Sequence, residues 1–329
     1  MTRLHILALG ALAGLAAFAA QGAVPAGPRL AFPVACVLGR TCEIQHYVDR
    51  DLGPGVRDYR CTTQTYQGHN GIDIRLLDMA AQRRGVDVLA SAAGTVARVR
   101  DGVADISVRA PGASPVANQE CGNGVAISHG GGWETQYCHM ARGSIRVRPG
   151  DVVAAGAPIG RVGLSGNTEY PHLHMTVRLN GAVVDPFAPE SGAGCTAQGD
   201  MWTPEARTAM TYRLGVVLNA GFAAGPVTPD QVEAGGIAPP GRSSPYIVAY
   251  ARGIGLQAGD EIELELKGPD GVSLARNRAQ PLDRWKAQWV TYVGKKAPVT
   301  GWTGGTYVAD YRVWRQGKVA ISRRFEVRL

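Results

Sequence analysis

Histidine and aspartate residues occur in this chain in three short clusters whose spacing suits metal chemistry. The clusters are Gly68-His69-Asn70-Gly71-Ile72-Asp73, Tyr137-Cys138-His139-Met140 and Pro171-His172-Leu173-His174. Zinc binds imidazole nitrogen and carboxylate oxygen at roughly 2.0–2.2 Å, and a catalytic zinc site takes three protein ligands and leaves one position for water. Together the clusters can supply three ligands and two further imidazoles. They therefore indicate metal-assisted hydrolysis of a peptide bond as the reaction class.

The first cluster is predicted to be extended. His69 and Asp73 are four residues apart, so on a strand they lie on the same face. That spacing would also suit a helix. Gly68 and Gly71 disfavour the helix, because glycine is costly inside one.

The other two clusters also fit strands. His172 and His174 are two residues apart and are expected on one face, as are Tyr137 and His139. We therefore predict a groove that receives side chains from three strands. Three neighbouring side chains are expected on the opposite side: Cys138, Leu173 and Met175.

These clusters resemble the signature of the lysostaphin/LytM-type zinc metallopeptidases, which cut peptides in bacterial cell walls. That family shows H-x-G-x-D, then Y-x-H, then G-x-H-L-H. Here the matching segments run from His69 to Asp73, from Tyr137 to His139 and from Tyr170 to His174, with Tyr170-Pro171 in place of the usual Gly-Pro. The resemblance covers about residues 32–189 and implies the duplicated hybrid motif fold of the family.

The resemblance also implies roles for five residues. His69, Asp73 and His174 would bind Zn²⁺, and His139 and His172 would be the metal-free catalytic imidazoles. One imidazole would accept a proton from a zinc-activated water while the other stabilises the oxyanion. The sequence does not decide which of the two is the general base.

Two further histidines lie outside this set. His129, in Ser128-His129-Gly130, is interpreted as structural. His46 is interpreted as a surface or packing residue.

The chain is predicted to be all-β, with an antiparallel peptidase sheet followed by an immunoglobulin-like β-sandwich. Asn180-Gly181 between apolar runs predicts a two-residue hairpin. Strict alternation, as in Glu261 to Lys267, predicts half-buried strands in the C-terminal part. The strands expected in the peptidase part are residues 71–74, 87–90, 94–99, 123–129, 134–140, 158–162 and 172–179.

Five segments are predicted along the 329 residues. Residues 1–22 resemble a secretory signal peptide, with Arg3 before a short apolar run. An N-terminal arm (23–60), the peptidase domain (61–192), a Gly/Ala/Pro-rich linker (193–241) and the β-sandwich (242–329) follow. We expect the protein to be periplasmic or secreted, with no transmembrane segment once the signal is removed.

Six cysteines agree with export, because an even count in an exported chain favours disulfides. Cys36 and Cys42 are expected to close a local loop. Cys61 and Cys121 are a plausible second pair, which leaves Cys138 and Cys195. Sequence alone does not select one of the 15 connectivities.

Charge is uneven along the chain. Residues 201–329 hold 17 Lys and Arg against 11 Asp and Glu, whereas residues 1–200 hold 17 against 16. An anionic envelope polymer is therefore one candidate partner, and an ordinary solvated surface is the alternative. No nucleic-acid motif occurs. Four tryptophans in the C-terminal part fit either a core or a sugar-binding surface: Trp285, Trp289, Trp302 and Trp314.

The leading hypothesis is a zinc metalloendopeptidase that hydrolyses peptide cross-links of bacterial peptidoglycan. The alternative is a non-catalytic envelope protein of the same fold that binds and regulates another cell-wall hydrolase. The presence of all five residues favours the enzyme.

Overall fold

The computed structural model describes residues 26–110, 112–113, 116–190 and 199–329. The predicted signal peptide and Cys195 lie outside these residues. In the described part of the chain no helix is both long and apolar enough to span a membrane.

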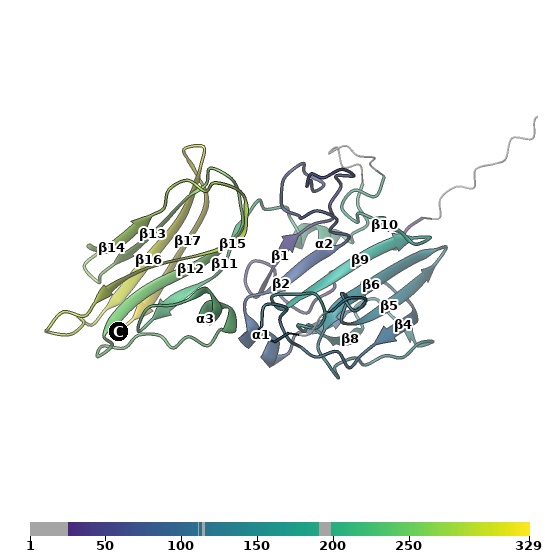
Figure 1. The fold of residues 1–329 in the computed structure, drawn as a ribbon, viewed down its shortest axis with the longest axis horizontal. Helices are drawn as coiled ribbons and strands as arrows, with labels where there is room; N and C mark the ends of the chain where they lie inside the picture. Colours follow the sequence, from purple (N-terminus) through teal and green to yellow (C-terminus); the bar gives the residue numbers. More distant parts are fainter. Residues whose placement is uncertain (1–25, 111, 114–115, 191–198) are drawn as a thin grey trace, which may run out of the picture.

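The first half of the structure is an antiparallel sheet with the strand order β1-β2-β9-β6-β5-β4-β7, and β10 pairs with β9 (Figure 1). A small second sheet pairs β3 with β8. One face of the main sheet covers a core that includes Ile72, Ile74, Leu173 and Met175. The elements are β1 (Cys42–His46), β2 (Ile72–Leu76), α1 (Met79–Arg84), β3 (Asp87–Leu89), β4 (Gly94–Arg100), β5 (Asn123–Gly130), β6 (Trp133–Met140), β7 (Val152–Val153), β8 (Pro158–Arg161), β9 (His172–Leu179) and β10 (Ala182–Val184).

All seven predicted strands of this part are present, with bounds that differ by at most two residues. The predicted hairpin at Asn180-Gly181 is confirmed, because the turn joins β9 to β10 and both residues have positive φ, 49° and 84°. In the segment predicted as an arm, Cys42–His46 forms β1 and pairs with β2. The segment is therefore part of the sheet over these residues.

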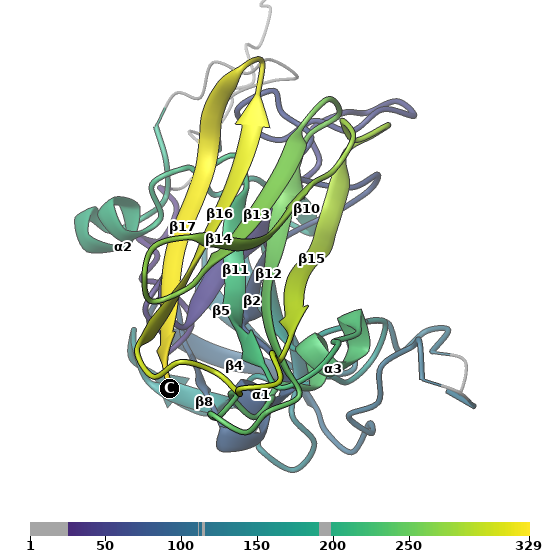
Figure 2. The ribbon, with the colours of Figure 1, turned by 90° about the vertical axis from the view of Figure 1, so that its left-hand side faces the viewer.

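The second half is a β-sandwich of two antiparallel sheets, β11-β12-β15 and β14-β13-β16-β17 (Figures 1 and 2). The buried apolar side chains of both sheets form one core, which includes Leu264, Val293, Tyr311 and Trp302. The predicted all-β class is confirmed. The elements are α2 (Pro204–Ala209), β11 (Val216–Ala223), α3 (Pro229–Ala234), β12 (Tyr246–Leu256), β13 (Glu261–Lys267), β14 (Ser273–Arg278), β15 (Lys286–Lys296), β16 (Thr306–Arg315) and β17 (Lys318–Arg328).

The structure differs from the predicted linker of residues 193–241. Its described part contains α2, β11 and α3, and β11 is an edge strand of the sandwich. The register of β11 shifts between Val217 and Asn219, so its apolar residues do not alternate regularly. That irregularity explains why the sequence pattern did not reveal the strand.

A buried ionic cluster joins the two halves. Arg75 of β2 is fully buried and donates to Glu233 of α3 at 2.5 Å and to Gln288 of β15 at 3.0 Å. Arg252 of β12, which is 1% exposed, donates to the same oxygen of Glu233. Burial and the neighbouring Arg75 lower the pKa of Arg252, whereas Glu233 raises it. One carboxylate therefore compensates two buried guanidinium groups, and α1 lies against α3 beside them (Figure 1).

We predict that Glu233→Ala destabilises the protein strongly. Removing the shared partner leaves two buried cations side by side, a change that typically costs about 3–5 kcal/mol. Glu326→Ala, on an exposed position of β17, is the control and should change stability by less than about 0.5 kcal/mol. Urea denaturation followed by fluorescence measures both. Equal stabilities of the two variants would contradict a central role of the cluster.

Candidate metal centre

Three side chains that the sequence singled out as metal ligands converge at the start of β2 and β9. His69 lies in the loop before β2, Asp73 is on β2, and His174 is its direct partner on β9. His69 Nε2 is 3.1 Å from Asp73 Oδ1, His174 Nδ1 is 3.0 Å from the same oxygen, and the two nitrogens are 3.1 Å apart. Among the described residues, His69, Asp73 and His174 form the group of three His, Cys, Asp or Glu side chains whose ligand atoms lie close enough together to hold one metal ion.

The geometry of the trio fits a tetrahedral zinc ion. Ligand atoms at about 2.0–2.1 Å from the metal lie roughly 3.3 Å from one another in a tetrahedron. The observed separations of 3.0–3.1 Å are close to this value. Two neutral imidazoles and one carboxylate are a donor set that zinc accepts.

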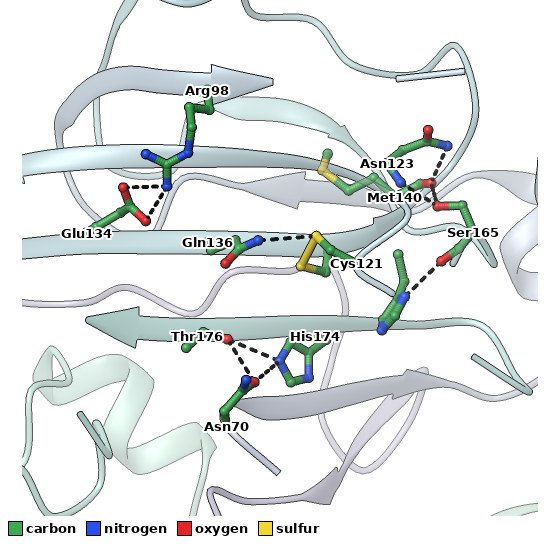
Figure 3. Close-up of a disulfide and its surroundings, with 12 residues drawn as sticks. Asn70, Arg98, Cys121, Asn123, Glu134, Gln136, Met140, Ser165, His174 and Thr176 are labelled. Carbon is green, nitrogen blue, oxygen red and sulfur yellow. Dashed lines mark hydrogen bonds and ion pairs between the residues drawn. A yellow bond between two sulfur atoms is a disulfide. The ribbon is translucent and has the colours of Figure 1, made fainter. Parts of the chain in front are cut away.

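Hydrogen bonds to the remaining ring nitrogens leave the inward nitrogens free to bind a metal. Nδ1–H of His69 donates to the carbonyl of Tyr47 at 2.7 Å. Nε2–H of His174 donates to Asn70 Oδ1 at 3.0 Å, with Thr176 Oγ1 at 3.1 Å (Figure 3). Such outer partners fix the tautomer and the orientation of a ligand histidine.

His46 of β1 also belongs to the centre. The sequence analysis interprets this histidine as a surface or packing residue. It is 5% exposed, and its Nδ1 lies 3.0 Å from Asp73 Oδ2, the carboxylate oxygen that faces away from the ligand nitrogens. Its position holds the Asp73 carboxylate in orientation. Twenty-seven residues separate the two, and no motif in the sequence links them.

His139 and His172 lie beside the trio. Their ring centroids are 4.6 Å apart, and His172 Nε2 is 3.3 Å from Asp73 Oδ1. Nδ1–H of His139 donates to the carbonyl of Ser165 at 2.8 Å, and Nδ1 of His172 lies 3.0 Å from the carbonyl of Tyr170. Both Nε2 atoms can therefore carry the lone pair. The structure brings all five predicted residues together.

His129 stands apart from this group. Its Nδ1 bonds to the carbonyl of Ala93 at 2.8 Å, and its Nε2 lies 2.9 Å from Thr135 Oγ1. Both ring nitrogens are thus engaged in structural contacts, as the sequence analysis expected.

Electrostatics at the centre favour an ionised carboxylate and a neutral imidazole. Burial raises the pKa of Asp73, but the histidines around it outweigh burial and hold that pKa well below its usual range. Burial, together with the neighbouring His172 and His174, lowers the pKa of His139 well below its usual value. Burial also lowers the pKa of the ligand His174, whereas at the ligand His69 the nearby Asp73 outweighs burial and raises the pKa, so a metal ion bound by the trio would displace a proton held by His69.

The predicted orientation of β6 is wrong. Tyr137, expected in the groove, lies in the core, where its hydroxyl meets the backbone N–H of Ser91 at 2.7 Å. Cys138, expected on the opposite side, faces the groove because it pairs in register with His174. His139 nevertheless reaches the groove, because its φ of 61° breaks the alternation of the strand.

The disulfide pairing also differs from the plausible Cys61–Cys121 pair. Cys121 is bonded to Cys138, and the bridge lies beside Gln136, across from His174 and Asn70 (Figure 3). The carbonyl of Cys121 accepts the backbone N–H of His139 at 2.8 Å. The bridge and this hydrogen bond together fix the backbone of His139. The predicted Cys36–Cys42 bond is confirmed.

We predict that Gly71→Ala weakens metal binding although Gly71 is not a ligand. A Cβ there would lie 2.5 Å from the carbonyl oxygen of Met175 and 2.7 Å from His174 Nε2, so β9 or the imidazole must move. We expect a loss of zinc affinity of about 10–100-fold, the range found for changes around metal ligands. Competition with a chromophoric chelator measures it. Gly225→Ala, where no atom lies within 4 Å, should bind zinc normally, and unchanged affinity of Gly71→Ala would contradict the close-packing argument.

Comparison with known proteins agrees with this site. The sequence model of peptidase family M23 matches residues 67–186. Over 129 residues the chain is 35% identical to the DD-carboxypeptidase/endopeptidase Mpg of Neisseria meningitidis serogroup B, a match that covers 38% of this chain and 23% of that protein. Over 125 residues it is 29% identical to the cell division protein DipM of Caulobacter vibrioides, covering 38% and 17%. The chain thus spans less than a quarter of these relatives.

Solved structures with similarity include a zinc-containing peptidase from Vibrio cholerae, with 24% identity, a TM-score of 0.32 and coverage of 47% of this chain and 37% of that one. They also include the catalytic domain of lysostaphin from Staphylococcus simulans, with 23% identity, a TM-score of 0.28 and coverage of 43% and 85%. The predicted resemblance is confirmed at the level of the family. Residues 67–186, which contain His69, Asp73, His139, His172 and His174 but not His46, match the sequence model of peptidase family M23.

Proposed function

We propose that this protein is a zinc-dependent endopeptidase that hydrolyses peptide cross-links of bacterial peptidoglycan. The observation that carries the proposal is the meeting of His69, Asp73 and His174 at 3.0–3.1 Å with two further imidazoles beside them. Membership of residues 67–186 in peptidase family M23 supports peptide hydrolysis as the chemistry. The predicted signal peptide supports a site of action in the periplasm or outside the cell.

His69, Asp73 and His174 would hold the metal. A zinc ion bound by them would supply Lewis acidity, polarising a peptide carbonyl and lowering the pKa of a bound water towards about 7. His46 would keep the Asp73 carboxylate oriented through its 3.0 Å contact with Oδ2.

His139 and His172 would move protons and stabilise charge. Each imidazole is held through its Nδ1, at 2.8 Å from Ser165 and 3.0 Å from Tyr170, so each presents Nε2 to the reacting groups. One accepts a proton from the attacking water and later donates it to the leaving amine. The other, in its protonated form, donates a hydrogen bond to the oxyanion.

A non-catalytic role in binding another cell-wall hydrolase is the alternative. Such a role requires neither a trio with metal-binding spacing nor two imidazoles fixed at their Nδ1 atoms. The chain retains all five residues in one place, and this favours hydrolysis. Intact sacculi incubated with purified protein, followed by mass spectrometry of released fragments, test the activity and identify the bond that is cut.

We expect Asp73→Ala to remove most of the bound zinc and the hydrolytic activity. The variant keeps only two histidine ligands, and it leaves His46 without its carboxylate partner. Elemental analysis of protein purified with zinc measures the metal, with Asp270→Ala, in an exposed turn of the sandwich, as the control. Stoichiometric zinc in Asp73→Ala would refute the ligand assignment.

We expect His139→Ala and His172→Ala each to retain zinc and to lose turnover by about 10²–10⁴-fold, the usual value of a general acid or base. His129→Ala is the matched control, because this histidine is bonded to Ala93 and Thr135 and lies outside the centre. Release of soluble wall fragments and zinc content are measured for all three. Near-normal hydrolysis by either of the first two variants would show that its histidine has a structural role.

A further inference from the structure

Two hollows open on either side of the metal centre. One, of about 410 Å³, lies over β6 and β9 and is lined by His69, His139 and His174. The other, of about 640 Å³, reaches His46, Asp73 and His172. Tyr66 and Asn167 line both hollows, so they are neighbouring parts of one groove that passes the centre.

The second hollow has a wall that the M23 domain does not supply. Three consecutive residues of the sandwich line it: Arg284 and Trp285, which directly precede β15, and Lys286, the first residue of that strand. The facing wall comes from the peptidase half and includes Arg109 and Tyr170. The groove beside the metal centre is therefore completed by the C-terminal part of the chain.

Buried contacts fix this wall relative to the reacting groups. Arg75 lies 3.8 Å from the ring centroid of Tyr170 and donates to Gln288, two residues after Lys286. The ring of Tyr170 lies 5.1 Å from that of His172. A single buried guanidinium thus contacts both the sandwich wall and the segment that carries a predicted catalytic histidine.

The lining of the second hollow has a positive surplus. Apart from Asp73, which belongs to the metal centre, its charged residues are Arg109, Arg284, Lys286 and Glu169. Asp283 forms an ion pair with Lys286, with 2.7 Å between Oδ1 and Nζ. Counting Asp283 as well, three cations face two carboxylates, and one positive charge remains.

Two of these cations are available to an incoming anion. The Arg284 side chain is 75% exposed, and its nearest carboxylate, Asp283, is 3.9 Å away. Arg109 pairs with Glu169 at 2.8 Å, but their side chains are 70% and 37% exposed, and exposed pairs of this kind contribute little. Guanidinium groups bind carboxylates through two parallel hydrogen bonds. The half-buried Trp285 adds an aromatic surface for the apolar stem of a ligand.

We propose that Arg284, Trp285 and Lys286 of the sandwich, with Arg109 opposite them, form a subsite for a free carboxylate of the peptide substrate. The proposal rests on the proposed function, because it places one end of the cleaved peptide in this hollow. The sandwich then selects the substrate as well as flanking the catalytic domain. Peptides that carry a carboxylate next to the bond to be cut bind better than their amidated forms.

The test uses the full chain and one peptide preparation in two forms. Cross-linked wall peptides released by a muramidase are used as isolated, and again after their carboxylates have been converted to carboxamides. Binding to each form is measured by calorimetry, and hydrolysis as kcat/KM. The variants are Arg284→Gln/Lys286→Gln and Trp285→Ala. The matched control is Lys295→Gln/Lys296→Gln, which removes two exposed positive charges from the other end of β15.

We expect the first double variant to bind the carboxylate form about tenfold or more weakly, to bind the amidated form like the unmodified protein, and to retain zinc and thermal stability. Trp285→Ala should weaken both forms, and the control double variant should change neither. The subsite would be overturned if the first double variant lost affinity equally for both peptide forms, if it lost no affinity, or if the control double variant lost as much affinity. Absence of hydrolysis by the unmodified protein, with preferential binding of the carboxylate form retained, would overturn the proposed activity and leave the subsite standing.

Discussion

The burial of Asp73 is the constraint on which the arrangement of this site depends. The side chain is almost fully buried, and an ionised carboxylate in such a place is strongly unfavourable unless positive or hydrogen-bonding groups surround it. Ring nitrogens of His69, His172 and His174 lie near Oδ1, and one of His46 lies at Oδ2. When these rings are protonated or turn an N–H to the carboxylate, they outweigh burial and lower its pKa, and a metal ion bound by the trio would take over that role when the nitrogens carry lone pairs. The antiparallel pairing of β2 with β9 places Asp73 opposite His174, and the pairing of β1 with β2 brings His46 to the other oxygen. The sheet and the metal centre therefore depend on the same strand register.

His139 shows how the fold places a histidine that strand geometry would direct into the core. Its positive φ is unfavourable for a residue with a Cβ, and such conformations persist where the surroundings determine them. Three constraints act here: the Cys121–Cys138 bond, the backbone hydrogen bond to Cys121, and the side-chain hydrogen bond to Ser165. A disulfide lining the groove thus holds the backbone that aims an imidazole at the centre.

The sequence predicted the parts of the structure that follow from local rules. The seven strands and the hairpin at Asn180-Gly181 follow from alternation and turn chemistry, whereas the choice of the trio follows from the resemblance of the motifs to a known family. The orientation of β6 was not predictable, because one backbone dihedral at His139 reverses the expected faces. The contact of His46 with Asp73 and the pairing of Cys121 with Cys138 depend on which strands become neighbours. Local sequence patterns do not specify strand neighbours. The strand β11 was missed because its register shift at Val217 interrupts the alternation.

The two halves of the chain are coupled by charge as well as by packing. Burying Arg75 and Arg252 costs free energy that apolar side chains at the same two positions would avoid. Glu233 compensates the charge of both arginines. An apolar contact would leave the sandwich freer to slide, whereas hydrogen bonds from Arg75 to Glu233 and Gln288 define one position. That position sets Arg284, Trp285 and Lys286 along the groove beside His172. A fixed sandwich can therefore act as a wall of the substrate groove, which a flexibly tethered domain would do poorly because each binding event would have to order it first.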